Sequence, residues 1–404
     1  MAVVRIALRN LWLDMRRAAL VALALAFGVG VLVFLWGFND GAHEQMRRNL
    51  QETITGSLAV HARGWFAQPK LRRWIADPEK VRDALRRAGA ERIAVRVRAV
   101  ALVAAENRSQ GARLLGVEPA AERQTTKLAR KITGRWFSGE HAAEVIIGRG
   151  MARTLGVDVG ATLVLLAPDR FDALAAELVR CVGIIESGEQ GLDRGLVIAP
   201  IGFVRRLLSL EREAHEVIAV LPDEGTTRRV QKAVRASLGE GFEVLRWDEM
   251  YPVMRQWIEI DDAFMYIFLG IVLIVASAGV AAAAMMRTLE RTAEFGVMRA
   301  LGATKGFIAA VVIVESLVVA AVGTALGAAG GIGAVGIAAR YGIDLSRNAE
   351  TLARYYFDPV VHPMLDAAHL AQTIAASLLV AVLASLWPAW RAATIPPTEA
   401  IRGV

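Results

Sequence analysis

Four long apolar runs interrupt the sequence, and each is long enough to cross a lipid bilayer. A bilayer core of about 30 Å needs about 20 apolar residues in a helix. Residues 18–39 and 263–286 contain no charged side chain, and residues 306–339 contain one acid, Glu315. The fourth run covers about residues 370–390. The pattern therefore predicts four transmembrane helices.

The segment between the first two runs has a different pattern. Residues 91–105, ERIAVRVRAVALVAA, alternate apolar and polar positions, as a half-buried strand does. Residues 145–168 read as strand, helix, turn and strand, and residues 216–238 as strand, turn and amphipathic helix. We predict an α+β domain in two lobes, with the middle of the segment inserted. Residues 41–55 and 250–261 read as helical stalks that continue the flanking spans.

The predicted fold is thus an α-helical membrane domain of four transmembrane helices plus a large α+β domain outside the cytoplasm, inserted between helices 1 and 2. The expected parts are 1–40, the N-terminus and first transmembrane helix; 41–261, the outer domain; 262–286, the second helix; 287–305, a cytoplasmic segment; 306–339, the third helix; 340–369, an outer loop; and 370–404, the fourth helix and cytoplasmic tail.

Composition and charge agree with a mixed membrane and water-soluble protein. The chain has 404 residues, of which 55% are hydrophobic, and a mean hydropathy of +0.40. Its net charge of +7 does not indicate nucleic acid, because basic residues gather beside the apolar runs. Arg16 and Arg17 before the first run, and Arg287 and Arg291 after the second, place both flanks in the cytoplasm. Residues 40–262 then lie outside.

No motif for catalysis or metal binding occurs. The sequence has no phosphate-binding loop of the G-x-x-x-x-G-K-[ST] type, so the chain does not bind ATP by that mechanism, and we expect no enzyme activity, cofactor or metal in it. Cys181 is the one cysteine, which excludes an intrachain disulfide. We interpret His362 and His369 as solvated loop residues. Glu315 reads as a hydrogen-bonding group at the inner membrane surface or as a proton carrier.

The cytoplasmic segment has the pattern of a short amphipathic helix. Leu289, Gly296, Val297 and Leu301 recur at helical spacing, and a charged face carries Glu290 and Glu294. Arg291 can pair with Glu294 at a spacing of three residues. Gly302 is a suitable helix end, and Thr304 a suitable N-cap for the third span. Periodicity leaves two interpretations open, a helix lying in the membrane surface and a helix that docks a cytoplasmic partner.

Several stretches resemble a known family. The stretch RTLERTAEFGVMRALGATKGFIAAVVIVESLVVAAVGTALGAAGG resembles the cytoplasmic helix and third span of ABC-transporter permeases of the four-span mechanotransmission superfamily, which includes FtsX-like and MacB-like permeases. The end of the chain, with YYFDPVVHP and WPAWRAATIPPTEAIRGV, resembles the lipoprotein-releasing (LolC/LolE-type) permeases. GARLLGVEPAAER in the outer domain and the first span are similar to that group as well.

The resemblance implies a location and a set of partners. It implies a multi-pass protein of the bacterial inner membrane with a periplasmic domain. The partners would be a separate cytoplasmic ABC ATPase that binds ATP and Mg, a second permease copy or paralogue, a lipoprotein or lipid cargo, and a periplasmic chaperone. The cytoplasmic segment would be the coupling helix on the ATPase. Its contact residues would be Glu290, Glu294, Phe295, Met298, Arg299, Ala300, Gly302 and Ala303.

The function implied is extraction of lipoproteins or lipids from the outer leaflet of the inner membrane. Alternatives are an efflux permease that drives a periplasmic tunnel and a regulator of a periplasmic hydrolase. A lipid-extracting permease needs apolar side chains at the outer-leaflet depth. The candidates are Phe34, Phe38, Phe264, Phe268 and, in the outer loop, Tyr355, Tyr356 and Phe357. The last three either contact cargo or form an aromatic belt at the membrane interface.

Overall fold

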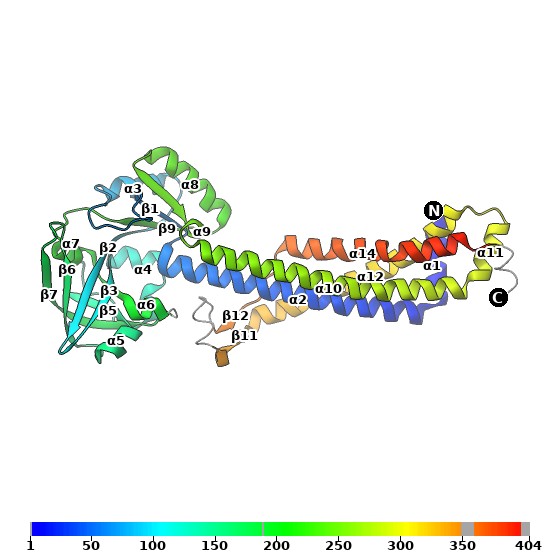
Figure 1. Ribbon diagram of the computed structural model, residues 1–404, viewed down its shortest axis with the longest axis horizontal. Helices are drawn as coiled ribbons and strands as arrows, with labels where there is room; N and C mark the ends of the chain where they lie inside the picture. The colour runs from blue at the N-terminus through cyan, green and yellow to red at the C-terminus, as the bar shows by residue number, and fades with distance from the viewer. Residues whose placement is uncertain (1, 188–189, 349–358, 397–404) are drawn as a thin grey trace. The chain divides into compact units, whose positions relative to one another are not determined.

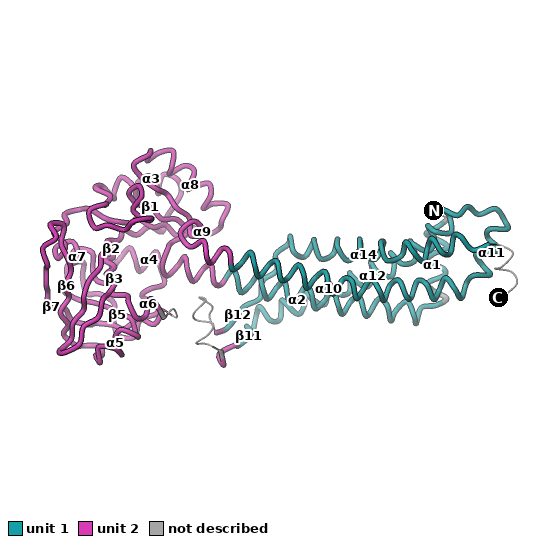
Figure 2. Tube along the Cα trace, viewed as in Figure 1, with its two compact units in different colours: residues 1–44, 257–344, 360–404 teal, residues 45–256, 345–359 magenta. Residues whose placement is uncertain are grey.

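The computed structural model describes residues 2–187, 190–348 and 359–396. The chain forms two compact units (Figure 2). Unit 1 contains residues 1–44, 257–344 and 360–404, and unit 2 contains residues 45–256 and 345–359. The predicted residues Tyr355, Tyr356 and Phe357 lie outside the described residues.

Unit 1 is built from long helices (Figure 1). The helices that contribute to it are α1 (Ala2–Leu13), α2 (Met15–Leu50), α10 (Pro252–Glu290), α11 (Thr292–Ala300), α12 (Lys305–Tyr341) and α14 (Ala367–Thr394). Of these, α2, α10, α12 and α14 are long and apolar enough to cross a membrane, which confirms the four predicted spans. Strands β11 (Ile343–Asp344) and β12 (Val360–Val361) pair in the loop between α12 and α14.

Two helices extend beyond their apolar runs, as the stalk pattern predicts. Helix α2 continues to Leu50 and then into the π-helix η1 (Gln51–Thr55). Helix α10 begins at Pro252, where proline suits the first turn because its missing N–H is not needed there. The ends of both helices belong to unit 2.

Small residues allow α2 and α12 to approach closely. A Cβ added at Gly327 would lie 2.4 Å from the carbonyl oxygen of Ala26, and one at Gly323 would lie 2.7 Å from that of Ala22. These distances leave no room for any side chain. Glycines four residues apart let helix backbones pack tightly in lipid, where burial of apolar surface does not drive association. Gly323 and Gly327 therefore allow the backbones of α2 and α12 to pack closely.

Unit 2 is an α+β domain around one large sheet. Its strands are β1 (Leu58–Ala62), β2 (Arg92–Ala105), β3 (Arg108–Val117), β4 (Ile132–Gly134), β5 (Glu144–Gly148), β6 (Thr162–Pro168), β7 (Leu174–Ile185), β8 (Leu196–Pro200), β9 (Glu216–Val220) and β10 (Phe242–Arg246). The order is β10-β1-β9-β2-β3-β8-β5-β7-β4, and β6 pairs with β2 and β7. The helices are α3 (Pro78–Arg87), α4 (Pro119–Thr125), α5 (Arg149–Leu155), α6 (Gln190–Gly195), α7 (Ile201–Leu207), α8 (Glu224–Leu238), α9 (Trp247–Met250) and the 3-10 turn η2 (Leu128–Lys131).

The sheet joins the two predicted lobes into one unit. Its outer strands β1, β9 and β10 come from the two ends of the segment, and β3 to β8 come from its middle. The long strand β2 pairs with β9 along its first half and with β3 and β6 along its second half. The inserted middle is thus present, but it shares a sheet with the rest. One apolar core lies against α3, α5, α7 and α8.

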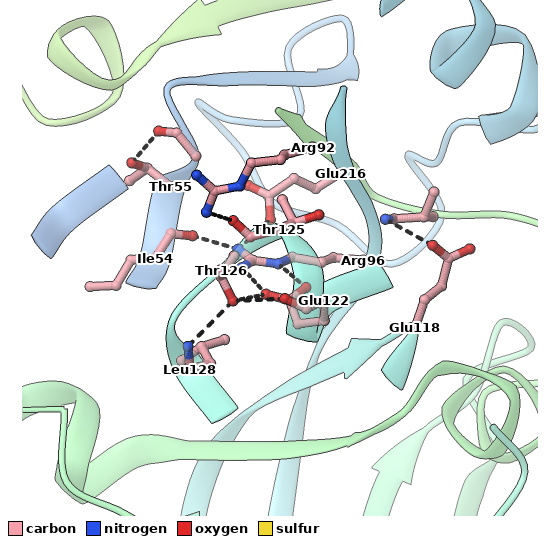
Figure 3. Close-up of polar contacts among 12 residues, drawn as sticks. Ile54, Thr55, Arg92, Arg96, Glu118, Glu122, Thr125, Thr126, Leu128 and Glu216 are labelled. Atoms are coloured by element: carbon pink, nitrogen blue, oxygen red, sulfur yellow. Dashed lines mark hydrogen bonds and ion pairs between the residues drawn. The ribbon is translucent and has the colours of Figure 1, made fainter. Parts of the chain in front are cut away.

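A buried arginine fastens the end of η1 to this sheet (Figure 3). Arg96 of β2 is fully buried, and its Nε and Nη2 donate to the two carboxylate oxygens of Glu122 at 3.1 and 2.6 Å. Its Nη1 donates to the backbone carbonyl of Ile54 and lies 3.7 Å from Glu216. The guanidinium therefore satisfies a carbonyl at the end of a helix, where no intrahelical donor is available.

Two histidines beside this cluster are buried in neutral form. Nδ1 of His61 lies 3.0 Å from the carbonyl oxygen of His215, so it carries the hydrogen. In His215, Nδ1 accepts from the Arg98 N–H and Nε2 donates to the Leu71 carbonyl. Burial lowers the pKa of both imidazoles. For Glu216, burial raises the pKa, but the positive charges of Arg98 and Arg96 outweigh it and leave the carboxyl below its usual range.

We expect Gly327→Leu to break the contact between α2 and α12. A side chain there meets the Ala26 backbone, and overpacking costs about 1–3 kcal/mol or more. The matched control is Gly330→Leu, because a Cβ at Gly330 meets nothing within 4 Å. Thermal unfolding of the purified protein should show a lower midpoint for Gly327→Leu alone. Equal midpoints in the two variants would contradict this packing.

We expect unit 2 to lose stability as pH falls below about 6.5. The pKa of His61 is lower in the fold than the unfolded value of about 6.5, so the unfolded chain binds the proton first. The contribution of neutral His61 to the free energy of unfolding is therefore complete above that pH and declines below it. Unfolding monitored between pH 7.5 and 5.5 should show this slope, and His61→Gln should reduce it to the part that comes from His215. The control His141→Gln removes an exposed histidine and should leave the slope unchanged; a flattened slope there would contradict the assignment.

Candidate coupling site and lipid groove

The short helix α11 is attached to the membrane helices by one aromatic side chain. Phe295 is 2% exposed and packs with Ile308 and Val312 of α12 and with Ala389 and Ala392 of α14. Phe295 was predicted to contact a partner, but in this structure it faces the protein interior. Its burial explains how a helix of nine residues keeps a defined position beside α12 and α14.

A buried ion pair fixes the N-terminal end of α11. Nη1 of Arg291 donates to Oε1 of Glu315 at 3.0 Å, and its Nε donates to Glu294 at 2.8 Å. The guanidinium carbon also lies 5.3 Å from the centre of the Phe295 ring. The predicted pair between Arg291 and Glu294 is therefore confirmed.

Glu315 joins three helices. It is 4% exposed on α12, and Asn10 of α1 donates to the same carboxylate oxygen as Arg291, at 2.8 Å. A carboxylate buried this deeply must be paired or hydrogen-bonded, because its charge cannot be solvated by lipid. The contacts agree with the hydrogen-bonding interpretation of Glu315. The sequence did not predict α1 or the role of Asn10.

The turn after α11 has the expected chemistry. Gly302 has φ 94°, a left-handed conformation that favours glycine, and the N–H groups of Gly302 and Ala303 donate to carbonyls of the last turn. The Thr304 hydroxyl accepts from the Phe307 N–H at 3.2 Å and so caps α12, as predicted. Space is available at Gly302, since a Cβ there meets nothing within 4 Å. A substitution at Gly302 would therefore act through backbone strain and not through a clash.

The predicted contact residues of α11 differ in exposure. Glu294, Ala300 and Gly302 are exposed, and Met298, Arg299 and Ala303 are half-buried. Glu290, at the end of α10, forms an ion pair with Arg17 of α2 at 2.5 Å. The most exposed apolar side chain nearby is Leu301, at 83%, which was not among the predicted contact residues. Leu301 was identified only as part of the apolar face of the helix.

The opposite end of unit 1 carries a second polar cluster. Nδ1 of His369 lies 2.9 Å from Asp40, and the His369 ring stacks on Trp36 with ring centres 3.9 Å apart. His43 contacts Asp261 at 3.0 Å. His369 lies in the first turns of α14 and is mostly buried, so the prediction of a solvated loop histidine was wrong for it. His362 is exposed, as expected.

An apolar groove runs between α2 and α10. It has a volume of about 490 Å³. Its lining has no polar side chain: Leu20, Val21, Ala24, Leu25, Phe27, Gly28, Ile271, Val272, Val275, Ala276, Gly279 and Val280. The same two helices also make polar contacts beyond the groove, Arg17 with Glu290 toward the cytoplasm and Asn39 with Asp262 toward the periplasm. The 22 residues from Arg17 to Asn39 rise about 33 Å, close to the thickness of a bilayer core.

The predicted lipid-contact aromatics lie beside this groove and do not line it. Phe264 and Phe268 are exposed on α10, at 64% and 42%. Phe34 and Phe38 on α2 are half-buried. The groove is lined instead by residues nearer the cytoplasmic ends of both helices, among them Phe27, which is 76% exposed. Aliphatic residues of this kind give no sequence signal that separates a groove from an ordinary lipid-facing surface.

Comparisons with known proteins agree with this architecture. The model of the MacB-like periplasmic core domain matches residues 18–237, and the model of the FtsX-like permease C-terminal matches residues 266–397. The chain therefore belongs to the family of ABC-transporter permeases that combine these two domains. It is a multi-pass protein of the inner membrane with a periplasmic domain, and as a permease it is a transporter subunit and not an enzyme.

Several curated relatives have lipoprotein-releasing names. The lipoprotein-releasing system transmembrane protein LolC of Xylella fastidiosa is 24% identical over 391 residues, which cover 94% of this chain and 92% of that protein. The corresponding LolE of Haemophilus influenzae is 22% identical, with the same coverage. Among solved structures, the periplasmic region of MacB from Actinobacillus actinomycetemcomitans matches 53% of this chain and 97% of that chain, with 11% identity and a TM-score of 0.37.

We expect Glu315→Gln to destabilise the permease more than Glu294→Gln does. Both changes remove a carboxylate partner of Arg291, but Glu315 is buried and the Glu294 side chain is 61% exposed. Loss of the buried partner should cost about 1–3 kcal/mol, and loss of the exposed one less than about 1 kcal/mol. Thermal unfolding of the two purified variants measures the difference. Equal losses would show that the buried pair does not hold α11.

Proposed function

We propose that this chain is the permease subunit of an ATP-driven transporter that extracts lipoproteins or lipids from the outer leaflet of the inner membrane. A separate cytoplasmic ATPase binds ATP and Mg and docks on α11. Two permease chains, identical or paralogous, form the membrane part. The periplasmic domain passes the cargo on to a periplasmic chaperone. The relatives with lipoprotein-releasing names, which align with 94% of this chain, support the cargo class.

The groove between α2 and α10 supports lipid cargo by its chemistry. Its lining lies in the middle and cytoplasmic parts of both spans, where it would receive the far ends of acyl chains. Each CH₂ group moved from lipid to water costs about 0.8 kcal/mol, so two long acyl chains cost on the order of 20 kcal/mol. A transporter for such cargo therefore needs an apolar surface that receives the chains as they leave the bilayer. A groove lined only by aliphatic residues, glycine and Phe27 meets this requirement.

The contacts of α11 support its role as the coupling element. Phe295 and Arg291 tie it to α12 and α14, so a displacement of α11 acts on membrane helices and not on a loose loop. Glu294 and Leu301 remain exposed for a partner. An interfacial helix without a partner needs no ion pair to α12, because lipid alone holds its apolar face. The buried pair favours docking over the purely interfacial interpretation.

Two other functions use the same architecture. An efflux permease would drive a periplasmic tunnel, and a regulator would control a periplasmic hydrolase; both need the coupling helix. Neither needs a groove of about 490 Å³ with a wholly apolar lining between α2 and α10. This observation favours lipid cargo over both.

We expect Leu301→Asp to weaken binding of the ATPase about tenfold or more without unfolding the permease. An exposed apolar residue at a docking surface contributes through burial, and a carboxylate there stays solvated and opposes docking. The control Leu174→Asp introduces the same charge at a residue that is 70% exposed in unit 2. Co-purification with the ATPase measures the effect. Unchanged complex yield in Leu301→Asp would mean that the partner docks elsewhere.

The cargo assignment is tested by photo-crosslinking from the groove. A photoreactive phenylalanine at Phe27 should capture lipid-anchored proteins in cells. The same residue at Leu326, which is 54% exposed on α12 and does not line the groove, should capture only bulk phospholipid. Identification of the crosslinked species by mass spectrometry distinguishes the outcomes. Capture of phospholipid alone at both positions, with lipoprotein cargo present, would contradict the proposal.

A further inference from the structure

Unit 2 contains a pocket of its own, in addition to the groove of unit 1. Its volume is about 350 Å³, within the range of about 300–1,000 Å³ that is usual for small-molecule sites. Its lining is Ile54, Trp65, Pro69, Lys70, Leu71, Arg98, Ala99, Val100, Arg113, Leu114, Leu115, Pro168, Leu192, Leu196 and Tyr251. Most of these side chains are apolar, three are cationic, and none is acidic.

The pattern of strands β2 and β3 places cations and apolar groups next to one another. In the paired strands, Arg98 lies opposite Leu115 and Val100 lies opposite Arg113. Val100 is 66% exposed although it is apolar. The two arginines are held in place, because Arg98 donates to Glu216 at 2.8 Å and Arg113 donates to the carbonyl of Gly191 at 3.2 Å. The lining thus combines an apolar surface with positioned positive charge.

A buried tryptophan adds a second indication of a ligand. Trp65 lines the pocket and is 5% exposed, and its ring stacks on His61 with centres 4.7 Å apart. Its indole Nε1 has no hydrogen-bond partner among the described residues. Buried tryptophan N–H groups usually donate a hydrogen bond, so an orphan donor in the wall of a pocket is unusual.

We propose that this pocket binds one acyl chain that ends in an anionic group. The aliphatic residues take the chain, and the cations take a carboxylate or phosphate at its end. A neutral apolar ligand has no group that pairs with Lys70, Arg98 or Arg113, and a folded protein partner does not enter a pocket of about 350 Å³. The inference rests on the proposed function only for the source of the chain, which would be the lipid cargo.

The pocket also contacts both stalk ends within unit 2. Ile54 is in the last turn of η1, and Tyr251 directly precedes α10. The Ile54 carbonyl is held by Arg96 while its side chain lines the pocket. A bound acyl chain therefore contacts both η1 and the residue before α10, the two segments that lead from the periplasmic domain to membrane helices.

The test is photolabelling of the full chain in phosphatidylcholine nanodiscs. Palmitic acid and palmitoyl phosphatidic acid, each carrying a diazirine on the chain, distinguish a free fatty acid from a membrane lipid as the source. Hexadecanol with the same diazirine tests the charge requirement. Peptide mapping should place the label of either acid at Val100, Leu115 or Leu196. Labelling by both acids or by one of them supports the site, and equal labelling by hexadecanol contradicts the anionic requirement.

Matched variants distinguish loss of the binding site from misfolding of the protein. Val100→Asp should reduce labelling by the acids about tenfold, which corresponds to 1.4 kcal/mol. The control Leu178→Asp carries the same change at a residue that is also 66% exposed but does not line the pocket, and should label normally. Lys70→Gln should reduce labelling by the acids and not by hexadecanol.

Labelling that is absent, or equal in wild type and Val100→Asp, overturns the site. Because this experiment needs neither the ATPase nor lipoprotein, its failure leaves the proposed function intact. Conversely, if the photoreactive residue at Phe27 captured no cargo, a positive photolabelling result at the pocket of unit 2 would still be valid.

Discussion

A carboxyl group buried among membrane helices needs protein hydrogen-bond donors in place of the water it has lost. Glu315 meets this condition through Asn10 of α1 and Arg291 at the start of α11. Three helices therefore meet at one buried side chain, and α11 cannot shift far without breaking the ion pair or carrying α12 with it. Phe295 supports the same contact by apolar packing. Helix α11, the proposed coupling helix, is thus a fixed part of the helical unit, while Glu294 and Leu301 remain exposed.

Unit 2 uses a comparable device where the chain leaves its first stalk. Arg96 binds the carboxylate of Glu122 and the backbone of Ile54, so the end of η1 is bonded to the central strand of the sheet. Breaking such a buried pair is costly because it leaves an unpaired charge in the interior. The last residues of η1 are thus fixed to the sheet within unit 2.

Patterns that depend on neighbouring residues were predicted well from sequence. The four spans, the strands at residues 92–105 and 216–220, the cap at Thr304 and the pair of Arg291 with Glu294 follow from hydropathy, periodicity and short spacings. Features that depend on contacts between residues far apart in the sequence were not predicted. Asn10 and Glu315 are 305 positions apart, the burial of Phe295 depends on α14, and the groove depends on two helices separated by the whole periplasmic domain. Single aliphatic or aromatic residues carry no signal for such contacts.

In the proposed function, this permease uses ATP hydrolysis in a partner to lift lipid-anchored cargo out of the bilayer. The most direct measurement reconstitutes the permease and its ATPase in proteoliposomes with a fluorescent lipoprotein and a soluble acceptor protein. The account predicts that ATP transfers lipoprotein to the soluble fraction, and that a non-hydrolysable ATP analogue does not. Robust ATP hydrolysis by the complex with no lipoprotein leaving the membrane would contradict it.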